Sequence, residues 1–89
     1  MATRQYLVVY EPTPNNWGAY APDIPGLGAT AATRAEMEAQ IRSAIEFLFE
    51  YLADEGQPIP EPHAKPQAGW DWGYVEVEVP DPPRRVRVS

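Results

Sequence analysis

The periodicity of the apolar residues changes at Thr33, and this change constrains the fold more than any other feature of the sequence. Thr33 and Glu36 match a capping box, in which the threonine oxygen accepts a hydrogen bond from an early helical N–H. After the box, apolar residues recur at helical spacing, at Met37, Ile41, Ala44, Ile45, Leu48 and Leu52. The sequence therefore predicts one long helix that begins after Thr33 and ends near Gly56, a residue suited to a helix C-terminus.

The segments on either side of this helix have the patterns of strands. Residues 4–11 are apolar on both faces, which is typical of a central strand. Prolines and glycines separate them from a second strand segment at 17–21 and a weaker third one at 27–32. Residues 73–79 alternate valine with glutamate, as a half-buried strand does. The predicted fold class is α+β, an antiparallel sheet with the element order β-β-β-α-β packed against one long helix.

The chain is short enough to form one small domain, which we expect to span residues 1–89. Residues 57–67 hold four prolines and favour an extended connector between the helix and the last strand. Residues 84–89 form a short basic tail.

Three aromatic residues widen the apolar arc of the predicted helix beyond what one sheet face covers. They are Phe47, Phe49 and Tyr51. A domain of this size is marginal on its own, and burial of this arc against a second copy would stabilise it. We therefore expect self-association through Phe47, Phe49 and Tyr51, as a homodimer or a higher homo-oligomer.

The distribution of charge excludes several classes of protein. The chain has 13 acidic and 7 basic residues, a net charge of −6, and this argues against a generic nucleic-acid binder. Residues 1–83 hold all 13 acids and four of the seven basic residues, a net charge of −9, whereas Arg84, Arg85 and Arg87 make the tail basic. The absence of cysteine excludes a disulfide framework. Without an apolar membrane span or a signal-peptide pattern, we expect a cytoplasmic protein.

Catalytic motifs are nearly absent. The only histidine, His63, lies in the proline-rich connector, where a solvated side chain is the favoured interpretation. Asp23 and Glu36 could converge on a divalent metal, but Asp23 is better explained as the cap of a Pro-Gly turn and Glu36 as part of the capping box. We predict no catalytic residue, no metal and no cofactor.

Tryptophans and acidic residues are the candidates for binding a partner. Trp70 and Trp72 are two residues apart, so they share one side of an extended segment, and Trp17 is expected nearby. Their alternative role is to cover the open end of a small core. The acidic helix face is a solvated face or steers a basic protein, and Glu46 and Glu50 are its candidate binding residues.

Four segments at this spacing resemble the N-terminal domain of the HicB-type antitoxin family. They are residues 6–12 (YLVVYEP), 17–26 (WGAYAPDIPG), 33–37 (TRAEM) and 54–62 (DEGQPIPEP). The resemblance covers most of the chain. Ala31, Ala32 and Leu27 depart from the family pattern at the turn into the helix, and the core pattern is intact.

This resemblance implies a degenerate ribonuclease H-like fold, related in shape to the double-stranded-RNA-binding fold. It also implies a non-catalytic protein that covers the active surface of a small basic RNA-cleaving toxin, of HicA type. Family members commonly carry a C-terminal DNA-binding module, and because few residues follow the matched segments here, DNA binding is not expected. Two alternatives stay open: an orphan homo-oligomeric domain with an unknown ligand, and a residual metal-dependent nuclease.

Overall fold

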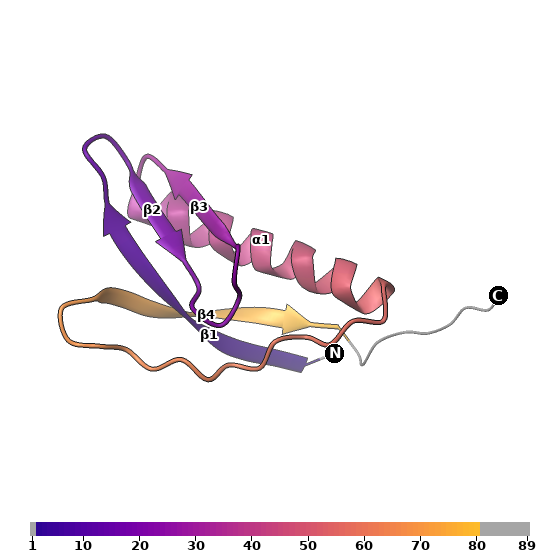
Figure 1. Cartoon of the computed structure of the whole chain (residues 1–89). Helices are drawn as coiled ribbons and strands as arrows, with labels where there is room; N and C mark the ends of the chain where they lie inside the picture. Colours follow the sequence, from indigo (N-terminus) through magenta and orange to yellow (C-terminus); the bar gives the residue numbers. More distant parts are fainter. Residues whose placement is uncertain (1, 81–89) are drawn as a thin grey trace.

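The computed structural model describes residues 2–80, which form four strands and one helix. Figure 1 shows them in chain order: β1 (Ala2–Pro12), β2 (Trp17–Tyr20), β3 (Gly28–Ala31), α1 (Arg34–Asp54) and β4 (Asp71–Val79). The predicted α+β class and the element order β-β-β-α-β are confirmed. The basic tail with Arg84, Arg85 and Arg87 lies outside the described residues. Within residues 2–80, no helix has both the length and the apolar character needed to cross a membrane.

The four strands form one antiparallel sheet in the spatial order β3-β2-β1-β4. β1 is central, as its two apolar faces predicted. It pairs with β4 along nearly its whole length, from Ala2 opposite Val79 to Tyr10 opposite Asp71. The much shorter β2 pairs only with the last residues of β1, from Val9 to Pro12. One edge of the sheet is therefore the short β3, and the other is the long β4.

The core lies between α1 and the face of the sheet that we call the front face. Tyr6, Val8, Val75 and Val77 are buried there. The helix contributes a row of buried side chains at Met37, Ile41, Ile45, Phe49 and Ala53. The ring of Tyr6 meets the ring of Phe49 edge to face, with centroids 5.3 Å apart. These positions follow the helical period that the sequence shows.

Both predicted ends of the helix are confirmed. At the start, Thr33 is the N-cap, and its Oγ1 accepts a hydrogen bond from the Glu36 backbone N–H at 3.2 Å, which is one of the two bonds of a capping box. At the other end, Gly56 adopts a φ of 73°, which a residue with a side chain rarely tolerates. The Gln57 N–H reaches back to the Leu52 carbonyl at 2.8 Å and satisfies one of the last helical acceptors.

The expectation that Phe49 shares an exposed face with Phe47 and Tyr51 is wrong. Phe49 is fully buried, whereas Phe47 and Tyr51 are 79% and 57% exposed. Phe49 lies four residues after Ile45 and eight after Ile41, so it continues the row that packs on the sheet. Only Phe47 and Tyr51 remain available to a second copy.

The connector between α1 and β4 is held by hydrogen bonds between its backbone and two side chains, those of Asp23 and Tyr6. The Asp23 carboxylate accepts from the N–H groups of His63 and Ala64, at 3.0 Å each, and the Tyr6 hydroxyl donates to the Pro60 carbonyl at 2.6 Å. Asp23 follows β2, so these contacts hold the connector on the β2 side of β1.

The connector must then cross the sheet, because β4 lies on the opposite side of β1. The helix occupies the front face, so the crossing runs over the other face, which we call the back face. Figure 1 shows the connector passing on the side of β1 and β4 away from α1. Leu7 and Val9 point to this back face and are only 1% and 2% exposed.

Candidate protein-binding surface

The outer edge of β4 carries backbone groups that no strand of the described chain pairs with. The Glu78 N–H donates to Glu46 Oε2 at 2.9 Å, so it points away from β1. In an antiparallel strand the direction of the N–H repeats every two residues. The N–H and C=O groups of Trp72, Tyr74 and Glu76 therefore also point outward, along an edge where β4 has no neighbouring strand. This row is the open edge of the sheet.

Two exposed aromatic rings lie on the back face beside this open edge. Trp72 is 40% exposed and Tyr74 is 45% exposed. Their ring centroids are 5.6 Å apart with an interplanar angle of 78°, an edge-to-face contact. Their register partners on β1 are Val9 and Leu7, which are buried. The aromatic pair thus borders a covered apolar strip and is itself left accessible.

Acidic side chains continue this surface toward the end of β4. Glu76 and Glu78 follow Trp72 and Tyr74 on the same face of the strand, and both are exposed. Glu46 reaches the same end from α1 and is fixed by its bond to the Glu78 N–H. Glu50, one helical turn further on, is exposed. The region combines open backbone groups, two aromatic rings and negative charge.

The three tryptophans do not gather in one cluster. Trp17 pairs with Ala31 and packs against the front-face core, with the Arg34 guanidinium carbon 5.9 Å from its ring centre. Trp72 lies on the back face. Trp70 is half-buried in the turn before β4, where its backbone N–H donates to the Gln67 carbonyl at 3.1 Å. The expected proximity of Trp17 to Trp72 fails because the strand register places them on opposite faces.

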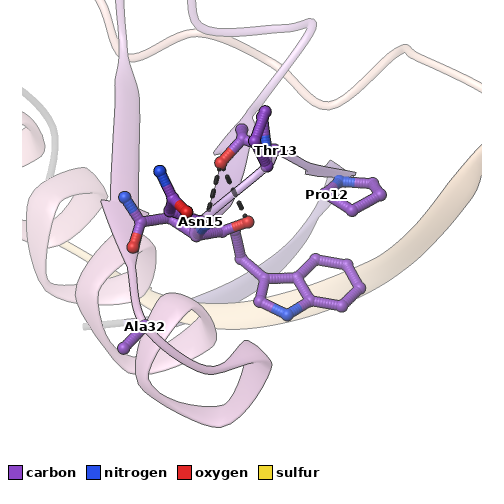
Figure 2. A pocket seen from close by; sticks show the side chains of 7 residues that line it. Pro12, Thr13, Asn15 and Ala32 are labelled. Carbon is purple, nitrogen blue, oxygen red and sulfur yellow. Dashed lines mark hydrogen bonds between the residues drawn. The ribbon is translucent and has the colours of Figure 1, made fainter.

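A shallow pocket lies at the turn between β1 and β2, next to Trp17 (Figure 2). Its lining residues are Pro12, Thr13, Pro14, Asn15, Asn16, Trp17 and Ala32. Thr13 Oγ1 accepts from the Asn16 N–H at 2.9 Å and donates to the Asn16 carbonyl at 3.0 Å, which holds the turn. The lining holds no ionisable side chain, so the pocket offers shape and amide groups but no acid–base chemistry.

An ion pair joins the start of α1 to the start of β4. Arg34 Nη1 lies 2.9 Å from Asp71 Oδ1, and the guanidinium carbon lies 4.3 Å from the centre of the Tyr10 ring. Burial raises the pKa of the Tyr10 hydroxyl, Glu38 raises it further, and the positive charge of Arg34 acts in the opposite direction. The pair links the first residue of α1 to the first residue of β4. Sequence spacing did not indicate it, because its members are far apart in the chain.

Of the two residues proposed for a metal site, Asp23 uses its carboxylate elsewhere, and Glu36 lies in the first turn of α1. Asp23 binds the connector backbone, and this corrects the expectation that it caps the Pro-Gly turn. Glu36 donates its backbone N–H to the helix cap. Among the described residues, no group of three or more histidine, aspartate or glutamate side chains is arranged to hold a metal ion.

Tyr74 belongs to this surface, although it was not among the residues expected to bind a partner. The signal was present, because period-two alternation from Trp72 places Tyr74, Glu76 and Glu78 on one face. The role of Glu46 as a cap of a strand N–H had no sequence signal, since it depends on the distance between α1 and β4.

Comparison with known proteins tests the family resemblance. No family model matches the sequence, and no curated protein matches it. Several solved structures, in contrast, are similar to this chain. The antitoxin HicB of Burkholderia pseudomallei is 26% identical, with a TM-score of 0.73 over 97% of this chain and 74% of that one. Its separate N-terminal domain is 25% identical, with a TM-score of 0.70 over 85% of this chain and all of that one.

A chain in a HicA3 and HicB3 toxin–antitoxin complex is also similar. It is 25% identical, with a TM-score of 0.64 over 88% of this chain and 100% of that chain. The fold and the surface described above define a small α+β domain with one helix on an antiparallel sheet and an accessible acidic edge. The likeness to these structures then makes the chain a HicB-like domain, as the four sequence segments indicated.

Proposed function

We propose that this chain is an antitoxin-type protein that binds and covers a small basic RNA-cleaving toxin of HicA type. The observation that carries the proposal is the match over the whole length of a chain found in a HicA3 and HicB3 toxin–antitoxin complex. The acidic charge of the chain supports it, because a protein that binds RNA phosphate presents a basic surface that an acidic domain complements.

In this proposal the domain acts by occupying a surface, and it needs no catalytic residue, metal or cofactor of its own. The candidate contact residues are Trp72, Glu46 and Glu50 from the sequence analysis, together with Tyr74 beside them. The protein would act in the cytoplasm as a single domain. Exposed Phe47 and Tyr51 support a homo-oligomer in addition to the toxin complex.

Co-expression tests the function. The test uses a HicA-type toxin candidate, sought as a small basic protein encoded next to the gene for this chain, which is expressed from an inducible promoter alone and together with the chain. We expect growth arrest from the basic protein alone, and recovery with a co-purifying complex when both are present. A toxin that remains active and elutes alone in the presence of the chain contradicts the proposal.

A further inference from the structure

The open edge of β4 has a defined length. The Glu46 carboxylate accepts a hydrogen bond from the outward N–H of Glu78, so this N–H is not available to an added strand. Within residues 2–80, the row without a strand partner is therefore that of Trp72, Tyr74 and Glu76, whose N–H and C=O groups point away from β1. An exposed strand edge of this kind is a template on which another extended segment can add by backbone hydrogen bonds.

The side chains along the row select the chemistry of the added strand. Glu76 and Glu78 are exposed on the back face, and Glu46 is held beside them. In a paired strand, side chains directly opposite lie within about 5.5 Å of each other, and opposite charges there are favourable. Arginine or lysine at alternate positions of an incoming strand would meet these glutamates and the faces of Trp72 and Tyr74.

A second copy of this chain fits the same edge poorly. Each copy has a net charge of −6 and would bring its own glutamates to the joint. Charge complementarity therefore favours a basic partner.

We propose that the open edge of β4 binds an extended basic strand of a partner protein, which joins the sheet beside Trp72, Tyr74 and Glu76. This inference rests on the proposed function for the identity of the partner, the basic toxin. The edge itself is tested without the toxin, so the two proposals fail separately.

Amide hydrogen exchange, resolved by residue, tests the edge in the full-length chain. The probe is the peptide Ac-Arg-Val-Arg-Val-Arg-NH2, with Ac-Glu-Val-Glu-Val-Glu-NH2 as the matched control. Without peptide, we expect fast exchange at Trp72, Tyr74 and Glu76, and slow exchange at Val75 and Val77, whose N–H groups face β1. At ten times its Kd the basic peptide should slow the three outward amides by about tenfold. The acidic peptide should have no effect.

A proline substitution at position 76 tests whether the outward N–H groups of β4 bind the peptide. Glu76→Pro removes one outward N–H and leaves the bonds to β1 in place, because proline is tolerated on a free edge. Glu76→Thr removes the same charge and keeps the N–H. We expect Glu76→Pro to abolish protection by the basic peptide and Glu76→Thr to weaken it only in part. Circular dichroism checks that each variant folds. If Glu76→Pro does not fold, Tyr74→Lys replaces it, because a lysine at position 74 should repel the arginines of the basic peptide and weaken its binding.

Three results would overturn the inference. Protection of the outward amides in the free chain at low concentration would mean that residues 81–89 already cover the edge. Protection that grows with protein concentration would assign the edge to a second copy. Glu76→Pro that co-purifies with the toxin at the wild-type level would leave the antitoxin function standing and exclude the open edge as its contact.

Discussion

Tyr6 and Tyr10 place two hydroxyl-bearing side chains on the buried face of the central strand. Burial raises the pKa of each hydroxyl above its ordinary value of about 10, since it disfavours the charged form. For Tyr6, Arg4 acts in the opposite direction but does not cancel the effect of burial. Folding therefore favours the neutral form of both side chains.

This pKa shift predicts a loss of stability at high pH. The unfolded chain loses the two protons first, so the free energy of unfolding is unaffected by these groups below about pH 10 and falls as the pH rises above it. Urea denaturation from pH 8.5 to 11.5 measures the effect, with a slope of at most about 1.4 kcal/mol per pH unit for each tyrosine. The variant with both Tyr6→Phe and Tyr10→Phe should lose most of this slope. An equal slope in wild type and variant would refute the assignment.

The two phenylalanines of α1 should contribute very differently to the free energy of unfolding. Phe49 is fully buried against Tyr6, so Phe49→Ala should lower the free energy of unfolding by about 3–5 kcal/mol. Phe47 is 79% exposed in the single chain, and Phe47→Ala should change the stability of the monomer, measured below the concentration at which the chain self-associates, by less than about 0.5 kcal/mol. Urea midpoints of the two variants measure the difference. Comparable losses in both would contradict the assignment of Phe49 to the core.

At the scale of the elements, the Asp23 carboxylate is one of the groups that hold the connector, together with the Tyr6 hydroxyl. Asp23→Ala removes the acceptor for the N–H groups of His63 and Ala64. We expect faster amide exchange at these two positions and a loss of about 1 kcal/mol in the free energy of unfolding.

His63→Ala is the control for this change, because His63 donates through its backbone and not through its imidazole. It should leave the protection of both amides unchanged. If His63→Ala disrupts the connector as much as Asp23→Ala does, the imidazole has a role that the hydrogen bonds do not explain.

The elements themselves were predictable because their signals are local. The capping box at Thr33 and Glu36 and the glycine at position 56 mark both ends of α1. The contacts between the elements could not be predicted in this way, because they depend on strand register and on residues far apart in the sequence. The separation of Trp17 from Trp72 follows from which residues of β2 and β4 lie opposite β1. The role of Asp23 follows from a connector about 40 residues away in sequence.

For the whole molecule, the fold class and the family likeness followed from the sequence, whereas the open edge needed the spatial order of the strands. The alternation in residues 73–79 predicts a half-buried strand, but it does not tell whether that strand is central or at an edge. The order β3-β2-β1-β4 settles this and leaves β4 accessible.

Self-association is a separate prediction at this scale. Because Phe47 and Tyr51 expose apolar rings on α1, we expect the chain to sediment as a dimer or larger species at micromolar concentration. The variant with Phe47→Ser and Tyr51→Ser should sediment as a monomer with unchanged helical content. A wild-type chain that is monomeric under these conditions rules out this use of the helix face.

The central claim is that this HicB-like domain neutralises a toxin by covering it. An RNA-cleavage assay with the purified basic partner, titrated with the full-length chain, measures this directly. We predict that cleavage falls in proportion to the added chain and stops near equimolar amounts, and that Tyr74→Lys shifts this end point to higher concentration. Cleavage that continues unchanged in the presence of excess chain would contradict the account.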